Sequence, residues 1–355
     1  MYGHPAATAV RRRLSIASRR LGTSDPSAAI GGLLDRTFEL PLGDPRYGNN
    51  ALVPGSMPLE HSFSEVAGQS LRLDLEPLGP GAAPISRRNE ANREMRRLVQ
   101  QSFGKRALDW FDERSEPWRG ADLAGNASFG AFFGAGFDGR GLQEAKVYYE
   151  LGPGQLEELP PNLRHATRTA MASLPGLQPL FVSVGCGRAR GSQRVYFTHR
   201  GDLRLLELEP LMNRLGIGRQ LPSLLTSIGL VLGGRFVLPE GAVVLGLRDT
   251  SKGMEMKLEI LLSGVSDPPR EMHGLIKMHL AQRPESHRAF QQWFQAMTPD
   301  EFANPGDISV VSARVTPAAG ARLSVYFRPV GYDAAPSRSR GNGHRQADPY
   351  AALTP

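Results

Sequence analysis

The chain has 355 residues, of which 40% are hydrophobic and 22% are charged, and its formal net charge is +7. This composition is typical of a globular protein and argues against a disordered chain, while the charge favours anionic partners such as nucleic acid, a membrane surface or a phosphorylated small molecule. The single cysteine, Cys186, excludes a disulfide framework, and no run of about eighteen apolar residues suggests a membrane span.

Basic residues gather at the two ends of the chain. Residues 11–20 (RRRLSIASRR) contain five arginines, and the last residues are polar and rich in Ser, Arg and Gly. Such charge blocks are usually solvated and flexible, so we expect a basic N-terminal segment over residues 1–29 and a disordered tail over residues 334–355. Residues 30–333 then form a single domain. The N-terminus lacks the apolar stretch of a signal peptide, which predicts a cytoplasmic protein.

Taken in chain order, the pattern repeats a unit of two strands followed by a helix. Alternating apolar and polar residues separated by short turns predict hairpins, and apolar residues at helical spacing predict helices between them. The predicted hairpins are 59–66 with 70–78, 127–137 with 143–151, 178–186 with 192–199, 242–248 with 254–262, and 307–315 with 321–329. The predicted helical segments are 87–104, 156–174, 204–233 and 268–297.

Ten antiparallel strands without an obvious edge strand suggest an α+β fold closed into a barrel. The helices then lie outside, so the outward strand positions are apolar and the inward ones are free to be polar. Residues 254–262 fit, because Met256, Leu258 and Ile260 share one face while Glu255, Lys257 and Glu259 share the other. An ordinary sheet with one wet face is the alternative, but related patterning in five hairpins favours the barrel with a solvent-filled lumen.

The inward face of the second strand of each hairpin repeats a basic residue, often with a tyrosine beside it. Several cations in one lumen require counter-charges, which Asp74, Glu76 and Glu259 supply only in part. The remainder predicts a ligand with more than one negative charge, and a diphosphate suits arginine and lysine donors. The residues in question are Arg72, Lys146 with Tyr148, Arg194 with Tyr196, Lys257, and Arg322 with Tyr326.

At this point the sequence resembles the dimethylallyltryptophan synthase (DMATS) family of aromatic, indole-directed prenyltransferases, which have the ABBA fold, or prenyltransferase (PT) barrel. The most specific piece is residues 58–78, PLEHSFSEVAGQSLRLDLEPL, which matches a P-x-E-x-S stretch followed by R-x-x-x-EP. The family's K-x-Y strand matches Lys146 and Tyr148, and the next such strand matches Arg194 and Tyr196. Residues 254–262 depart from the family, since Lys257 and Glu259 stand where Gln and Tyr are frequent.

The resemblance implies an enzyme of natural-product biosynthesis (secondary metabolism) that transfers a prenyl group, expected to be dimethylallyl, from its diphosphate to an indole or tryptophan-like ring. Glu60 would be the catalytic base, and we expect the surrounding cations to keep it ionised. The diphosphate would be bound by Arg72, Lys146, Tyr148, Arg194, Tyr196, Lys257 and Tyr326. Further pocket candidates are Glu259, Arg322, Phe129 and Phe132.

We expect no required cofactor and no metal ligands, because the cations can hold the diphosphate and no DDxxD-type cluster occurs in the sequence. The expected partners are the prenyl diphosphate and a small aromatic acceptor, with neither nucleic acid nor a membrane, in a monomer or homodimer. Two alternatives remain open: a prenyltransferase that acts on an aromatic residue of a peptide, and a non-catalytic basic protein that binds nucleic acid. The glycine-rich residues 185–191 (GCGRARG) lack the signature of a phosphate-binding loop and predict a hairpin turn.

Overall fold

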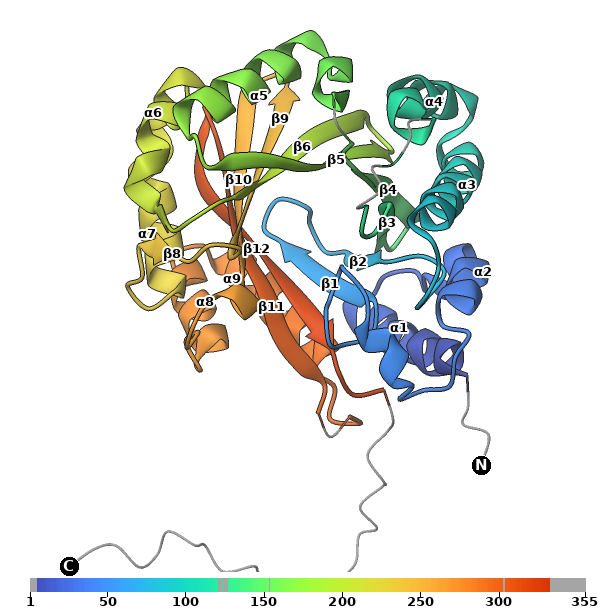
Figure 1. The fold of residues 1–355 in the computed structure, drawn as a ribbon. Coiled ribbons are helices and arrows are strands. Elements are labelled where there is room, and N and C mark those ends of the chain that lie inside the picture. Colours follow the sequence, from blue (N-terminus) through green and yellow to red (C-terminus); the bar gives the residue numbers. More distant parts are fainter. Residues whose placement is uncertain (1–4, 121–122, 124–126, 153, 303, 333–355) are drawn as a thin grey trace, which may run out of the picture.

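The computed structural model describes residues 5–120, 123, 127–152, 154–302 and 304–332, and its centre is a closed barrel of antiparallel strands (Figure 1). The strands follow one another around the barrel in the order β1-β12-β11-β10-β9-β6-β5-β4-β3-β2, so consecutive hairpins are neighbours. This confirms the predicted α+β barrel of five hairpins. The strands are β1 (Leu59–Ser64), β2 (Leu71–Leu75), β3 (Ala131–Asp138), β4 (Gly141–Glu150), β5 (Leu177–Gly187), β6 (Gly191–His199), β9 (Val243–Thr250), β10 (Gly253–Leu261), β11 (Gly306–Thr316) and β12 (Ala319–Pro329).

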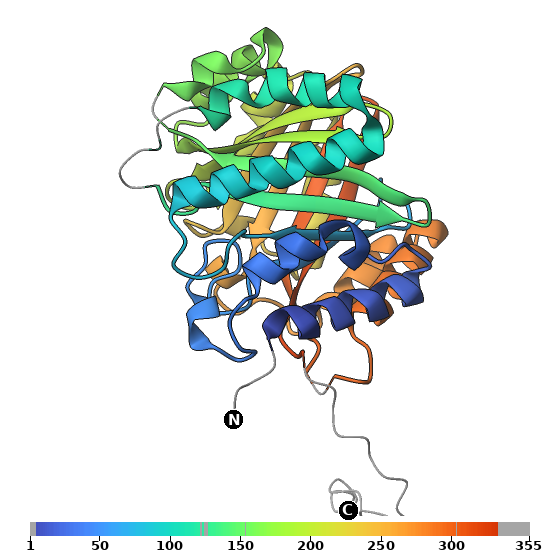
Figure 2. The ribbon, with the colours of Figure 1, turned by 90° about the vertical axis from the view of Figure 1, so that its right-hand side faces the viewer.

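Helical segments follow each of the first four hairpins and lie outside the barrel, as predicted (Figures 1 and 2). Figure 2 shows α3 and α4 (teal) lying across the outer face of the strands behind them. The α-helices are α1 (Ala6–Leu21), α2 (Ser27–Thr37), α3 (Pro84–Phe103), α4 (Lys105–Arg119), α5 (Pro161–Ser173), α6 (Glu209–Arg214), α7 (Leu221–Val231), α8 (Met272–Leu280) and α9 (Pro284–Met297). Short elements complete the described part: β7 (Leu203–Arg204), β8 (Val237–Leu238), η1 (Pro45–Gly48), η2 (Gln155–Glu158), η3 (Leu205–Leu208), η4 (Gly218–Gln220) and η5 (Leu262–Gly264).

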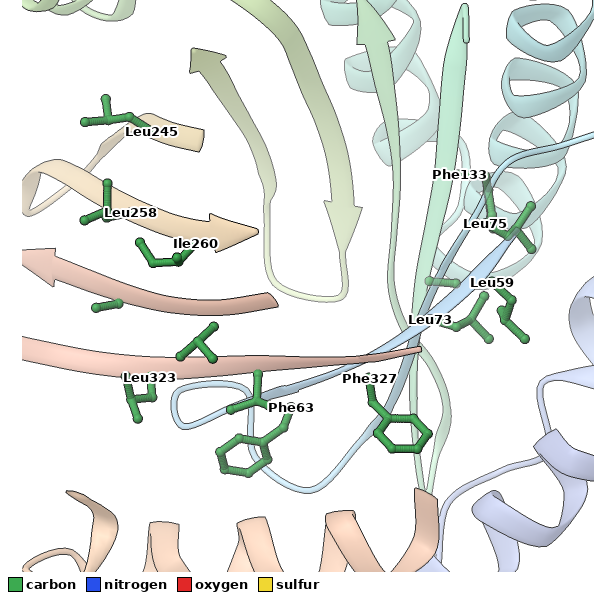
Figure 3. Close-up of a cluster of buried hydrophobic side chains, with 14 of the residues drawn as sticks. Leu59, Phe63, Leu73, Leu75, Phe133, Leu245, Leu258, Ile260, Leu323 and Phe327 are labelled. Atoms are coloured by element: carbon green, nitrogen blue, oxygen red, sulfur yellow. The ribbon is translucent and has the colours of Figure 1, made fainter. Parts of the chain in front are cut away.

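The apolar core lies between the barrel and its helices, not inside the barrel. Outward strand residues such as Leu258 are fully buried against this shell. Figure 3 shows Phe63 and Phe327 pointing from β1 and β12 toward a helix, where Phe63 meets the ring of Phe290 at a centroid distance of 5.4 Å. Because the helices satisfy the outward apolar positions, the inward positions of the strands are available for polar side chains.

The N-terminal segment departs from the prediction. Residues 6–21 were expected to be flexible and solvated, but they form helix α1, whose Val10 and Leu14 are fully buried in the core. Even Arg13 is buried, and it donates hydrogen bonds to the carbonyl oxygens of Met297, Pro305 and Gly331. The segment holds its place because the arginines share an amphipathic helix with a continuous apolar face. The predicted tail, residues 334–355, lies outside the described residues.

One further feature of the helical shell differs from the sequence analysis, and one agrees with the expected break of the span 204–233 near Gly216 and Pro222. The predicted helix 87–104 ends as expected at Gly104, which has a positive φ of 82°, but a second helix, α4, starts immediately after it. The helical span 204–233 is divided into η3, α6, η4 and α7, with Gly216 at positive φ between α6 and η4. Among the described helices, none combines the length and the apolar character that crossing a bilayer requires.

Candidate active site

The inner face of the barrel combines small residues on some strands with long polar residues on their neighbours. Gly134 on β3 is paired with Asp74 on one side and Lys146 on the other. Gly246 on β9 is paired in the same way with Tyr196 and Lys257. A glycine at these positions leaves room for the side chains of both adjacent strands, so the long residues project inward without collision.

A cavity of about 920 Å³ lies in this interior and opens among the turns of the hairpins. Its volume is at the upper end of the roughly 300–1,000 Å³ that small-molecule sites have, which suits two substrates held together. Basic side chains outnumber acidic ones along its wall, eleven to three. Eight of the predicted residues line it: Arg72, Lys146, Tyr148, Arg194, Tyr196, Lys257, Arg322 and Tyr326.

Four predicted residues lie outside that lining. Glu60 and Glu259 are polar residues of β1 and β10, whereas Phe129 and Phe132 stack on each other with ring centroids 4.1 Å apart. All four lie near strand ends that are remote from the hairpin turns. The predicted residues are therefore divided along the barrel, with the cations toward the open end and the base candidate and phenylalanines deeper.

Two of the cations near the open end pair with a carboxylate that the sequence analysis did not single out. Glu144 on β4 accepts a hydrogen bond from Arg72 and lies 3.2 Å from Nζ of Lys146. Burial alone would raise the pKa of Glu144, but Arg72 and Lys146 lower it well below its usual value. Glu76, which was expected to supply such a counter-charge, instead pairs with Arg87 of α3 at 3.0 Å and accepts from the backbone N–H of Ala51.

A buried triad occupies the position at which this sequence departs from the resembled family. Nζ of Lys257 donates to Glu259 and to the hydroxyl of Tyr326, which itself donates to Glu259 at 3.0 Å. Burial lowers the pKa of Lys257 to about 8, although the neighbouring Glu259 carboxylate opposes this shift. Lys257 is thus a cation of the cavity wall that is already hydrogen-bonded within the protein.

Glu60 lies on the inner face of β1, opposite Asp74 of β2, and accepts a hydrogen bond from the hydroxyl of Ser309. Burial raises its pKa to about 8, and the charges of Asp74 and Glu259 act in the same direction. The expectation that cations keep Glu60 ionised is therefore wrong, because burial dominates and Asp74 and Glu259 add to it. The hydrogen bond from Ser309 and the charge of Lys257 oppose the shift only in part. This raised pKa places Glu60 in the range of a general base that works near neutral pH.

Aromatic rings fill the interior around the inner tyrosines. The ring of Phe181 lies 4.4 Å from that of Tyr196 and 5.8 Å from that of Tyr148. Phe129 also meets Phe181 edge to face, at 6.2 Å. The sequence analysis missed Phe181, which the alternation along residues 178–186 would have placed on the same face as Ser183. The arrangement creates an apolar, electron-rich wall that can surround a hydrocarbon chain or stabilise a carbocation.

The remaining predictions concern the open end. Arg322 borders the cavity, pairs with Glu65 at 3.8 Å and keeps 41% of its side chain exposed, so it lies at the mouth. The predicted turn lies within residues 185–191, at residues 188–190 between β5 and β6, and both Arg188 and Arg190 border the cavity. The described residues contain no group of three or more His, Cys, Asp or Glu side chains placed to hold a metal ion.

Two cations of the wall were also missed. Arg248 of β9 and Arg314 of β11 line the cavity together with Arg194, and all three face Glu255 of β10. The sequence analysis collected only the second strand of each hairpin, whereas these arginines lie on first strands. The same two-residue period would have found them there.

No family model matches the sequence, and no curated protein matches it either. Solved structures do match. The 6-dimethylallyltryptophan synthase from Micromonospora olivasterospora, in complex with DMASPP and Trp, has a TM-score of 0.72 at 16% identity, over 94% of this chain and 100% of that chain. The 5-dimethylallyltryptophan synthase from Streptomyces coelicolor has a TM-score of 0.67 at 16% identity, over 92% and 98%. AnaPT from Neosartorya fischeri has a TM-score of 0.56 at 15% identity, over 81% and 82%. The chain shares the barrel fold of these structures, as the sequence resemblance predicted.

Proposed function

We propose that the chain is an aromatic prenyltransferase that transfers a dimethylallyl group from its diphosphate to an indole or tryptophan-like ring. The observation that carries the proposal is the convergence of Arg72, Lys146 and Arg194 on one cavity that also contains inner tyrosines and ends near a buried carboxylate. The likeness of the fold to structures named as dimethylallyltryptophan synthases supports it.

The first step in this proposal is departure of the diphosphate from the prenyl group. Arg72, Lys146 and Arg194 would donate charge-assisted hydrogen bonds to the phosphate oxygens and stabilise the negative charge that develops on them. The protein supplies these positive charges from its own side chains. We therefore propose that the reaction requires neither magnesium nor another cofactor.

The second step is attack of the aromatic ring on the allylic cation. The rings of Tyr148 and Tyr196 line the cavity next to Phe181 and would stabilise the cation through their π faces while keeping water away from it. Attack leaves a proton on the ring carbon or the indole nitrogen. We propose that Glu60 accepts this proton, directly or after the indole N–H has bound to it, and restores aromaticity.

Two alternatives find less support. Nucleic-acid binding was considered because of the basic ends of the chain, but the repeated cations of the strands lie inside a closed barrel, where a polynucleotide has no access to them. An aromatic side chain of a peptide remains a candidate acceptor of the same chemistry, and the assay below includes it.

The test is an assay with purified protein, dimethylallyl or geranyl diphosphate, and a panel of tryptophan, simple indoles and tryptophan-containing peptides, in the presence of EDTA. We expect a prenylated product with dimethylallyl diphosphate and a free indole compound, and the same rate with and without EDTA. Product formed only with peptides would assign the alternative acceptor. No product with any acceptor would refute the proposed function, and turnover that EDTA abolishes and Mg²⁺ restores would refute its metal independence.

A further inference from the structure

Three arginines from three strands surround a single carboxylate in the wall of the cavity. Glu255 of β10 is 3% exposed and accepts hydrogen bonds from Arg194 and from Arg248, the latter at 2.6 Å. Nε of Arg314 lies 3.5 Å from the same carboxylate. The strands that carry these residues, β6, β9, β10 and β11, are consecutive in the barrel, so the cluster is fixed by the sheet itself.

The charges of this cluster do not balance. Within the described part of the chain, Glu255 forms ion pairs with all three arginines. One negative charge among three positive charges leaves two positive charges in excess. Burial lowers the pKa of Arg314 to about 10, and Arg194 and Arg248 lower it further by repulsion. The Nε atoms of Arg248 and Arg314 are also buried without a hydrogen-bond partner. Buried, repelling donors of this kind create an environment that favours a larger anion than one carboxylate.

A second cluster in the same cavity also places one glutamate among several cations. Glu144 of β4 accepts from Arg72 and lies near Lys146, and Arg72 is close enough to Arg314 to contribute to the lowering of its pKa. Carboxylate and phosphate oxygens bind arginine through the same paired donors. Each glutamate therefore lies among donors that also suit a phosphate group.

We propose that Glu255 is an internal substitute for the terminal phosphate group of the prenyl diphosphate, and that the donor displaces it from Arg194, Arg248 and Arg314. This inference rests on the proposed function, since it specifies how the same cavity binds and releases its diphosphate. In the free protein Glu255 keeps the arginines apart and in place. When the product diphosphate has formed, the returning carboxylate competes with it for the same donors and speeds its release.

The test measures binding of inorganic diphosphate by titration calorimetry, without any prenyl group or acceptor, so that binding is separated from catalysis. If Glu255 competes with the ligand, Glu255→Gln binds inorganic diphosphate at least about 10-fold more tightly than the wild type, because the amide carries no charge and leaves the arginines more readily. Arg314→Gln should bind it at least about 10-fold more weakly. The control is Glu157→Gln, which removes a carboxylate that also pairs with two arginines, Arg164 and Arg168, but on the outer surface.

The outcomes separate this inference from the proposed function. A wild-type protein that does not bind inorganic diphosphate at all contradicts both. Wild-type binding with equal or weaker binding by Glu255→Gln overturns the substitution mechanism and leaves the prenyltransferase proposal standing. If Glu255→Gln does not fold, Arg314→Gln decides, because unchanged affinity in that variant shows that the cluster does not bind the diphosphate. In turnover assays, Glu255→Gln should show inhibition by inorganic diphosphate at concentrations at least about 10-fold lower than the wild type.

Discussion

At the scale of single residues, glutamates in different parts of the barrel interior have different pKa values. Glu144 lies between two cations, and its pKa is lowered although burial opposes this. Glu60 is more deeply buried, at 6% exposure against 31% for the Glu144 side chain, and burial together with Asp74 and Glu259 raises its pKa to about 8. The difference arises from burial and from the charges on the strands beside each carboxylate, and it makes Glu60 the better proton acceptor near neutral pH.

We expect this raised pKa to appear in the pH dependence of catalysis. As a base Glu60 must be ionised, so kcat/KM should rise with pH and level off above about pH 8. Glu60→Gln should lower turnover by at least about 100-fold and show no such rise. The measurement is a pH–rate profile of both proteins, together with donor binding, which the substitution should leave intact. A Glu60→Gln variant with wild-type turnover would remove Glu60 from the mechanism.

The same shift has a consequence for stability with a definite sign. Folding raises the pKa of Glu60 from its usual 4.5 to about 8, so the folded state holds the proton more tightly than the unfolded state. The contribution of this group to the free energy of unfolding is therefore fully present below about pH 4.5 and is lost as the pH rises through about 8. Urea denaturation at several pH values should show a smaller loss over this interval in Glu60→Gln.

At the scale of the secondary-structure element, the outward and inward faces of each strand follow different rules of composition. The outward residues of β10 pack against the helical shell, and its inward residues form the triad and the arginine cluster. On β3 the inward positions include Gly134 and Gly136, which make room for the long side chains of β2 and β4. The polar interior thus depends as much on the small residues as on the charged ones.

Two glycines of β3 provide a matched test of this dependence. A Cβ atom at Gly134 would lie 2.2 Å from Oδ1 of Asp74, whereas one at Gly136 would come no closer than 3.4 Å to Glu144. We expect Gly134→Ala to displace Asp74, to cost about 1–3 kcal/mol of stability and to reduce turnover strongly. Gly136→Ala should change both by much less. Thermal unfolding and turnover of the two variants check this, and equal effects in both would contradict it.

The packing of the outward apolar residues can be tested on β10. Leu258 is fully buried in the shell between barrel and helices (Figure 3), so Leu258→Ala should lower the free energy of unfolding by about 2–5 kcal/mol. The matched control is Leu206→Ala, because Leu206 is 63% exposed and should change stability by less than about 0.5 kcal/mol. Chemical denaturation measures both, and similar small effects would show that the shell is not the main core.

At the scale of the whole molecule, the first and last parts of the chain hold each other in place. β1 pairs with β12 and closes the barrel. Outside this pair of strands, Arg13 of helix α1 donates hydrogen bonds to the carbonyl oxygens of Pro305 and Gly331, which flank β11 and β12. The guanidinium also lies over the rings of Phe302 and Tyr332, at 4.9 and 5.5 Å from their centroids. The basic segment is therefore a structural part of the barrel.

We expect Arg13→Met to destabilise the folded protein by about 2–4 kcal/mol, because it leaves buried carbonyl groups without donors. Arg12 lies next to it on the same helix but is exposed, and Arg12→Met should have little effect. Differential scanning calorimetry of the two variants provides the measurement. Equal unfolding temperatures would mean that α1 does not fasten the closure of the barrel.

The sequence by itself determined the features that depend only on neighbouring residues along the chain. Alternation with a period of two, interrupted by turns, identified the five hairpins, the outward apolar faces and the inward positions of Lys146, Tyr148, Arg194 and Tyr196. These could be predicted because side-chain direction in a strand follows from position along that strand alone.

Only the tertiary structure decided what each inward side chain meets. Arg194 pairs with Glu255 of β10, and Glu255 also pairs with Arg248 of β9 and Arg314 of β11. The counter-charges Glu144 and Glu255 thus acquire their roles through pairing between strands. The same holds for the raised pKa of Glu60 and for the burial of Arg13, which depend on charge and solvent exposure in three dimensions. Electrostatic energy depends on distance in space and not on separation along the chain. The ion pairs and pKa shifts of this cavity therefore follow only from the three-dimensional structure of the closed barrel.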